Sequence, residues 1–138
     1  MPLHPHPLSK TAHVLALAAA LLAPAAHAAT TPQEQLAGYA QAAKTPGDAS
    51  RGQQFFTTRH GAEWSCSSCH TDKPTVDGKH AVTSKRIGPL APAFNAERFT
   101  DEAKTEKWFR RNCKDVLSRE CTDAEKADVL AYLLSLKK

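Results

Sequence analysis

Apolar residues near the C-terminus recur at intervals of three and four positions, which is the spacing of one face of an α-helix. The residues of this stripe are Val129, Leu130, Leu133 and Leu136. Directly before it, Thr122 and Glu125 stand in the spacing of a capping box, in which each side chain bonds the backbone N–H of the other residue. The pattern predicts a helix that opens at this box and buries the stripe.

Three further segments begin with residues that favour a helix start. Thr31 and Glu34 form a second capping box, and Asp48 and Asp101 each stand where an N-cap residue is expected. The helices predicted from these signals cover residues 32–43, 48–59 and 101–112. No internal repeat and no convincing strand is visible, so we expect an all-α fold of about four to five helices.

The segment between the second and third of these helices, residues 71–99, has no sustained helical or strand period. Proline and glycine recur along it, and it leaves room for one helical turn at most. A loop of this length in a small domain usually wraps a functional group. We therefore expect an ordered loop around a ligand or cofactor.

Residues 1–28 have the pattern of a secretory signal peptide. Lys10 is the only charged side chain, an apolar stretch covers residues 12–23, and the segment closes on Ala26-His27-Ala28. The apolar stretch is shorter than the roughly 20 residues that span a bilayer, which favours cleavage near Ala28 over an uncleaved anchor. The expected mature protein is one domain, residues 29–138, in the periplasm.

The charge of the chain excludes one class of partner. The chain has 18 Lys and Arg residues against 14 Asp and Glu, a formal net charge of +4, and the predicted signal peptide carries one of the lysines. The mature domain is therefore only weakly basic, so no nucleic-acid partner is expected.

The cysteines form two pairs with different spacing. Cys66 and Cys69 lie in a Cys-Ser-Ser-Cys-His run that ends at His70. Two intervening residues allow both sulfur atoms to bond the two vinyl groups of a haem, while the following imidazole reaches the iron. The run therefore predicts one covalent haem c with His70 as the proximal ligand. Cys113 and Cys121 are most simply a disulfide in an oxidising compartment.

Two other chemistries use closely spaced cysteines. A structural zinc site needs four ligands, usually from a second close pair, whereas Cys113 and Cys121 are eight positions apart with no histidine beside them. A thioredoxin-like dithiol needs a strand followed by a helix, and no such pattern surrounds Cys66. Both alternatives are weaker than haem c.

The sixth ligand of the iron is less obvious. Ordinary class I cytochromes c, which this chain resembles in layout, use a methionine there, but the only methionine is Met1. His60 and His80 lie ten positions before and after His70, too close to reach the opposite haem face easily, and lysine ligands stay possible. Asn112 shares a helix face with Trp108 and Phe109, which we expect to be buried, although an asparagine at a helix end is more often a C-cap.

A family resemblance bears on this choice. Residues 108–117, 120–122 and 128–133, with the sequences WFRRNCKDVL, ECT and DVLAYL, resemble the sphaeroides haem protein family, small high-spin cytochromes c with a DUF1924-type domain. The resemblance implies a class I cytochrome c fold around one haem, with Asn112 as the ferric ligand and a disulfide from Cys113 to Cys121. A related bis-histidine cytochrome has histidine where this chain has Asn112, which argues against that relative.

The segment before the third helix offers supporting contacts. Ile87-Gly88-Pro89-Leu90 resembles the class I segment whose proline carbonyl accepts the Nδ1 proton of the proximal histidine, although an ordinary turn is the alternative. The cations of the loop are possible partners of the haem propionates or merely solvated charges. They are Lys85, Arg86 and Arg98.

Two functions fit these expectations. In the first, reduction weakens the bond to Asn112 and opens a site for a diatomic gas, O₂ or NO, with electrons from a dihaem cytochrome c and a membrane cytochrome b, partners that the resemblance implies. In the second, a retained ligand leaves a plain electron carrier. A dedicated enzyme is the weaker expectation, since no separate acid–base pair is apparent.

Overall fold

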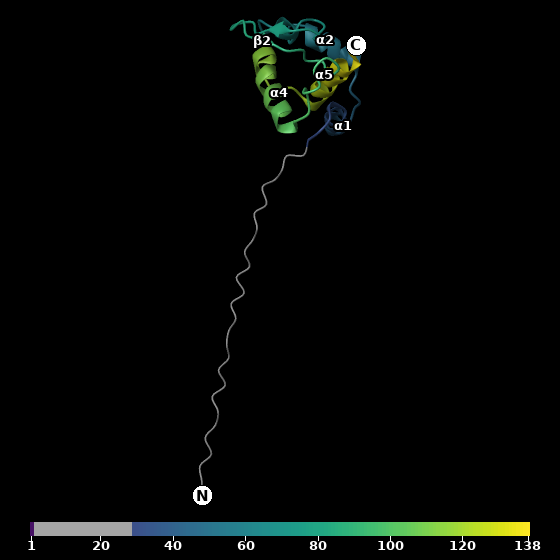
Figure 1. Cartoon of the computed structure of the whole chain (residues 1–138), viewed down its shortest axis with the longest axis vertical. Helices are drawn as coiled ribbons and strands as arrows, with labels where there is room; N and C mark the ends of the chain where they lie inside the picture. Colours follow the sequence, from purple (N-terminus) through teal and green to yellow (C-terminus); the bar gives the residue numbers. More distant parts are fainter. Residues whose placement is uncertain (2–28) are drawn as a thin grey trace.

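The computed structural model describes Met1 and residues 29–138 (Figure 1). The predicted signal peptide, apart from Met1, lies outside these residues. The elements in order are α1 (Pro32–Ala43), α2 (Ala49–Thr57), α3 (Ser67–His70), β1 (Gly78–Lys79), β2 (Arg86–Ile87), α4 (Glu102–Leu117) and α5 (Asp123–Ser135). None of the described helices is long and apolar enough to span a membrane.

The four long helices begin where their capping residues predict. The side chain of Thr31 accepts from Glu34 N and that of Thr122 from Glu125 N, with both reciprocal bonds of each capping box present. The carboxylates of Asp48 and Asp101 accept the N–H groups of Arg51 and Lys104 in the same way. The helix starts are therefore set locally by side chains that satisfy otherwise unbonded N–H groups.

The core lies where α1 and α2 pack on α5. Phe56, Leu130 and Leu133 are fully buried there, and Tyr132 packs against Phe56. α2 and α5 cross at Gly52, where a Cβ atom would lie 1.9 Å from the carbonyl oxygen of Asp128. Only glycine allows this approach, so the α2–α5 pair has a fixed crossing point.

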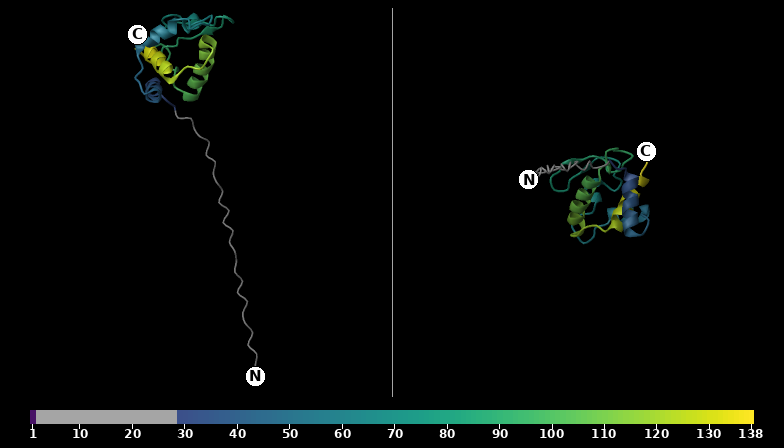
Figure 2. Two further views of the ribbon diagram at one scale, coloured as in Figure 1. Left: turned by 180° about the vertical axis from the view of Figure 1, so that it is seen from behind. Right: turned by 90° about the horizontal axis from the view of Figure 1, so that it is seen from below.

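α4 lies on the other side of the molecule from the α2–α5 pair, as the two views in Figure 2 agree. It continues to Leu117, five residues beyond the predicted end, because Cys113 and Val116 extend its buried face. The C-cap is Ser118, which adopts a left-handed conformation with φ 60°. The interpretation of Asn112 as a C-cap is therefore wrong, since Asn112 lies inside the helix.

The segment between α3 and α4 is ordered, but the expectation that it holds no strand is wrong. β1 and β2 pair antiparallel, with Gly78 opposite Ile87. The one expected helical turn is present at residues 91–95, where Asn95 N donates to Ala91 O at 3.1 Å. The segment folds back on itself at the buried Pro74, whose carbonyl oxygen accepts from Leu90 N and Ala91 N.

Candidate functional site

The Cys-Ser-Ser-Cys-His run forms the single turn of α3. Ser65, which is buried directly before the turn, shares hydrogen bonds with the hydroxyls of Ser67 and Ser68 at 3.0 and 3.1 Å. His70 N donates to Cys66 O at 3.1 Å, which closes the turn. Cys66 and Cys69 form no disulfide with each other or with the other two cysteines. One short turn therefore presents two thiols and the imidazole that follows them.

The ring of His70 lies against the core, 6.3 Å from the ring of Phe56 between centroids. Burial, aided by the nearby charge of Arg98, lowers the pKa of His70 to about 4. The imidazole is consequently neutral at physiological pH, and only a neutral imidazole has a nitrogen lone pair to offer a metal.

The protonation of Cys66 helps to decide whether the two cysteines serve a zinc ion, a redox-active dithiol or a haem. Burial raises the pKa of the Cys66 thiol to about 11, whereas zinc ligands and redox-active dithiols depend on the thiolate. Within the described residues, no group of three or more His, Cys, Asp and Glu side chains is placed to hold a metal ion. A haem needs no such group, because the porphyrin itself supplies four nitrogen ligands. A protonated Cys66 thiol beside a neutral imidazole fits haem c.

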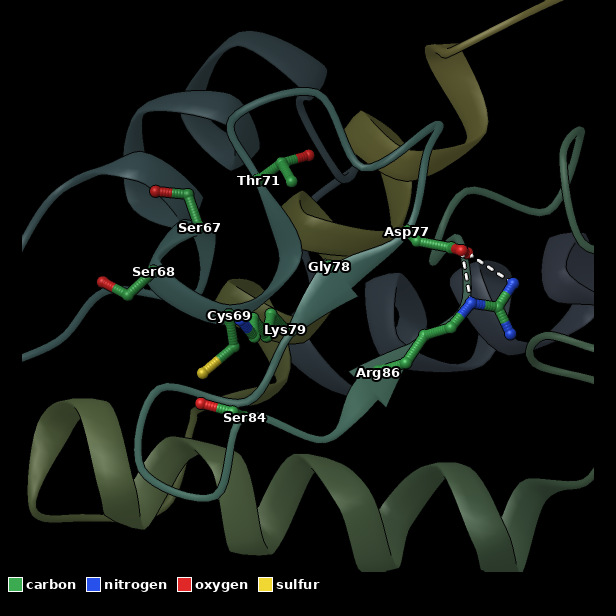
Figure 3. A pocket seen from close by; sticks show the side chains of 9 residues that line it. All are labelled: Ser67, Ser68, Cys69, Thr71, Asp77, Gly78, Lys79, Ser84 and Arg86. Atoms are coloured by element: carbon green, nitrogen blue, oxygen red, sulfur yellow. Dashed lines mark hydrogen bonds and ion pairs between the residues drawn. The ribbon is translucent and has the colours of Figure 1, made fainter.

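The β1–β2 hairpin packs tightly on α3 (Figure 3). A Cβ atom on Gly78 would lie 2.0 Å from the carbonyl oxygen of Cys69, so the two backbones meet here without a side chain between them. Ala81 N donates to the Sγ atom of Cys69 at 3.3 Å. A pocket of about 400 Å³ borders this contact and is lined by Cys69 and the hairpin, with the paired Asp77 and Arg86 at its far side.

The expected hydrogen bond from His70 to the Pro89 carbonyl is not formed. Pro89 O accepts instead from Arg98 Nε at 2.9 Å and from Asn95 Nδ2 at 3.3 Å, and Arg98 Nη2 donates to Gly88 O at 2.8 Å. Arg98 thus fastens this part of the loop. Of the proposed propionate partners, Arg86 is bonded to Asp77, while Arg98 retains unbonded guanidinium N–H groups.

The alternative histidine ligands both have local roles. The Nε2 atom of His60 lies 2.8 Å from the carbonyl oxygen of Phe55, and the two rings are in contact. The Nδ1 atom of His80 accepts the N–H groups of Val82 and Thr83 at 3.3 and 3.2 Å. These bonds account for both histidines as parts of turns.

Asn112 lies inside α4, far beyond α3 in the chain. Its side chain is partly buried and makes no hydrogen bond within the described part of the chain. The expectation that its neighbours on the helix are both buried is half wrong, because Phe109 is partly buried but Trp108 is 44% exposed.

The residue after Asn112 anchors the helix. Cys113 is 3% exposed and is bonded to Cys121, with their Cα atoms 5.6 Å apart. Cys121 lies in the connection to α5. The backbone at Asn112 is therefore tied covalently to the segment that starts the last helix.

Two contributors to this arrangement escaped sequence reasoning. Ser65 looked like an ordinary loop residue, although serines stand two and three positions after it and its hydroxyl shares hydrogen bonds with both of theirs. Gly78 looked like a turn glycine, whereas it is needed for the close approach to Cys69. Only the folded chain shows which backbone that glycine meets.

Comparison with known proteins gives one family match. Residues 42–133 match the family described as "Domain of unknown function (DUF1924)". The chain is 46% identical over 123 residues to the cytochrome c-type protein SHP of Cereibacter sphaeroides, a match that covers 86% of this chain and 95% of that protein. It is also 48% identical over 83 residues to cytochrome c'' of Methylophilus methylotrophus, covering 60% of this chain and 58% of that one.

Solved structures of the same relatives resemble the fold. Oxidised SHP, described as an oxygen-binding cytochrome c, matches with a TM-score of 0.74 and 44% identity over 78% of this chain and 99% of that one. Oxidised cytochrome c'' matches with a TM-score of 0.69 and 38% identity over 78% and 95% of the two chains. A solution structure of cytochrome c'', described in terms of haem-ligand detachment, matches with a TM-score of 0.69. The all-α class I cytochrome c fold expected from the sequence is confirmed.

Proposed function

Because this chain belongs to the DUF1924 family and to the group of monohaem c-type cytochromes that includes SHP and cytochrome c'', with one haem c as its cofactor, we propose that its distal ligand controls access of a small gas to the haem iron. Cys66 and Cys69 form the thioether bonds and His70 is the proximal ligand in this proposal. The carrying observation is one short turn that presents the sulfur atoms of Cys66 and Cys69 together with the imidazole of His70, which lies against the ring of Phe56 in the core.

Asn112 is the proposed distal ligand. Its amide oxygen is a hard, neutral donor, which suits ferric iron better than the softer ferrous ion. Haem c supplies an iron that alternates between these two states and takes a diatomic gas in the ferrous state. In the oxidised protein the amide oxygen of Asn112 would hold the iron, and on reduction the side chain would leave, so that its N–H group would be free to donate a hydrogen bond to the gas. The resemblance of residues 108–117 to the sphaeroides haem protein family implies this assignment.

The placement of Asn112 inside α4 also supports the proposal. A helix interior holds the Cα atom of a ligand firmly, while the short side chain keeps two free torsion angles with which to leave. Cys113, the next residue, carries the bond to Cys121, so the ligand and the disulfide move together.

The setting of this chemistry is part of the proposal. With residues 1–28 removed as a signal peptide, the mature domain of residues 29–138 acts in the periplasm. A dihaem cytochrome c and a membrane cytochrome b are the proposed electron donors, and O₂ or NO is the proposed gas ligand. The oxygen binding described for SHP favours a gas over a plain electron carrier.

The visible spectrum of the holoprotein separates the two functions. After anaerobic reduction, the proposal predicts a high-spin ferrous spectrum that CO converts to a low-spin one. A low-spin ferrous spectrum that CO does not change would mean that a strong ligand is retained, which is the behaviour of an electron carrier. Asn112→Ala should give a ferric spectrum with an altered sixth ligand and leave CO binding intact.

A further inference from the structure

Three helices meet at the carboxylate of Glu106 on α4. The hydroxyl of Tyr39, on α1, donates to Glu106 Oε1 at 2.6 Å, and the ammonium of Lys126, on α5, donates to the two carboxylate oxygens at 3.1 and 2.9 Å. Lys126 Nζ also lies 5.1 Å from the centroid of the Tyr39 ring. We call these three residues the Glu106 cluster. It closes a triangle of polar contacts between elements that are far apart in the sequence.

Much of the cluster is shielded from solvent. Tyr39 is 8% exposed, and the side chains of Lys126 and Glu106 are 14% and 33% exposed. Burial alone would raise the pKa of Glu106, but the hydrogen bonds from Tyr39 and Lys126 outweigh it and hold the pKa below its usual value. The carboxylate is therefore charged at neutral pH, and a charged acceptor forms the strongest hydrogen bonds with these donors.

Apolar contacts also hold α4 against the rest of the molecule, since Phe109 packs against both clusters of buried core residues. Phe109 packs on the rings of Tyr39 and Phe99, with centroids 5.8 and 6.5 Å apart, and Cys113 is bonded to Cys121. The Glu106 cluster and the disulfide lie seven residues apart, which is about two helical turns. One tether holds the first half of the helix, and the other lies directly beside Asn112.

A single covalent bond at Cys113, together with the apolar packing of Phe109, resists rotation and tilting of α4 less than the same contacts with a polar tether added two turns away. The Glu106 cluster supplies that second tether. A side-chain tip lies about 5 to 6 Å from the axis of its helix, so a turn of about 20° moves that tip by about 2 Å. A displacement of this size is large beside the tolerance of a coordinate bond.

We propose that the Glu106 cluster positions the distal ligand: by holding α4 at Glu106, Tyr39 and Lys126 keep the amide of Asn112 aligned for coordination. This inference rests on the proposed role of Asn112. The three residues touch neither the gas nor the iron, so they are positioning residues. Because α4 itself is held, reduction would release the ligand by rotation of the Asn112 side chain rather than by movement of the helix.

A double-mutant cycle on the ferric holoprotein tests the proposal, with imidazole as the competing distal ligand. Loosening the alignment of Asn112 should let imidazole displace it more easily, so Glu106→Gln should lower the dissociation constant of imidazole about tenfold. Tyr39→Phe removes one hydroxyl and keeps the ring on Phe109, and it should lower the constant about threefold. In an Asn112→Ala background, neither substitution should change it, because no aligned ligand remains.

The matched control is Arg51→Met. Arg51 makes a two-pronged ion pair with Asp128 between α2 and α5, so its loss removes a comparable pair that does not touch α4. It should lower the melting temperature and leave imidazole binding unchanged.

Each outcome decides one of two claims. An unchanged imidazole constant in Glu106→Gln and Tyr39→Phe overturns the positioning role, as does an equal change in the Asn112→Ala background, which would mean that the pocket has simply loosened. An Asn112→Ala protein that binds imidazole no differently from the wild type overturns Asn112 as the ligand. The first two results leave the proposed function standing, and the third does not.

Discussion

The two sides of the proposed haem site are held in different ways. On the side of His70, backbone meets backbone: Gly78 lies against the Cys69 carbonyl, and the turn of α3 is closed by its own hydrogen bonds and by Ser65. On the side of Asn112, α4 is held by side chains, chiefly the Glu106 cluster and the bond between Cys113 and Cys121. Contacts through backbone leave no freedom, whereas side-chain tethers are individually removable. The fold thus holds the proposed proximal ligand rigidly and leaves the proposed distal ligand free to be released.

The largest effect should come from filling the closest backbone contact on the fixed side. Gly78→Ala would place a Cβ atom 2.0 Å from the Cys69 carbonyl oxygen, which forces β1 away from α3. We expect a loss of about 3 kcal/mol in the free energy of unfolding, measured by urea denaturation of the holoprotein.

Gly38→Ala is the control for that substitution. Gly38 lies within α1 with open space around its Cβ position, so alanine should stabilise the protein by about 0.5 to 1 kcal/mol. Equal stabilities for the two variants would show that the contact between β1 and α3 gives way easily.

Breaking the disulfide should have the next largest effect. Cys113 and Cys121 close a short loop, and the chain-entropy model assigns such a loop about 2.5 kcal/mol. The double substitution to alanine should cost this much stability in thermal unfolding and, unlike Gly78→Ala, should also alter the ferric spectrum. A normal ferric spectrum in a destabilised protein would show that the disulfide stabilises the fold but does not affect coordination by Asn112.

The predictability of the fold follows the range of the interactions. Capping residues act on the N–H groups of their own first turn, so the helix starts at Asp48, Asp101 and Thr122 follow from the sequence. The end of α4 does not, because Asn112 resembles a C-cap locally, while burial of Cys113 and Val116 continues the helix. The position of this helix end therefore depends on burial against the rest of the fold, which the local sequence does not reveal.

The site shows the same division. Cys66, Cys69 and His70 follow from one motif, since the spacing is imposed by the cofactor. The Glu106 cluster joins residues that are 67 and 20 positions apart, and no local pattern links them. The two-residue strands are equally invisible, because Gly78 and Ile87 pair across a hairpin whose register depends on α3.

The smallest expected effect is on the pH dependence of stability, and it arises on the side of Asn112, where the Glu106 cluster holds α4. The folded protein lowers the pKa of Glu106, chiefly through the hydrogen bonds of Tyr39 and Lys126 acting against burial. A lowered carboxyl pKa stabilises the fold above the ordinary value of 4.5, and this contribution is lost as pH falls through the folded pKa.

Glu106→Gln should therefore flatten the loss of stability below about pH 4.5, by under about 1 kcal/mol, in unfolding curves recorded at several pH values. Arg51→Met should keep the pH dependence that the Glu106 carboxyl contributes. The same acid dependence in Glu106→Gln as in the wild type would show that this carboxyl contributes nothing to it.

The central claim is that Asn112 binds ferric iron and leaves on reduction. Crystal structures of the holoprotein in the oxidised state and after reduction in the crystal measure this directly. The account predicts the Oδ1 atom of Asn112 at bonding distance from iron in the first structure and turned away in the second, with α4 and His70 unmoved. The same ligand at bonding distance in both states, or a different residue opposite His70, would contradict it.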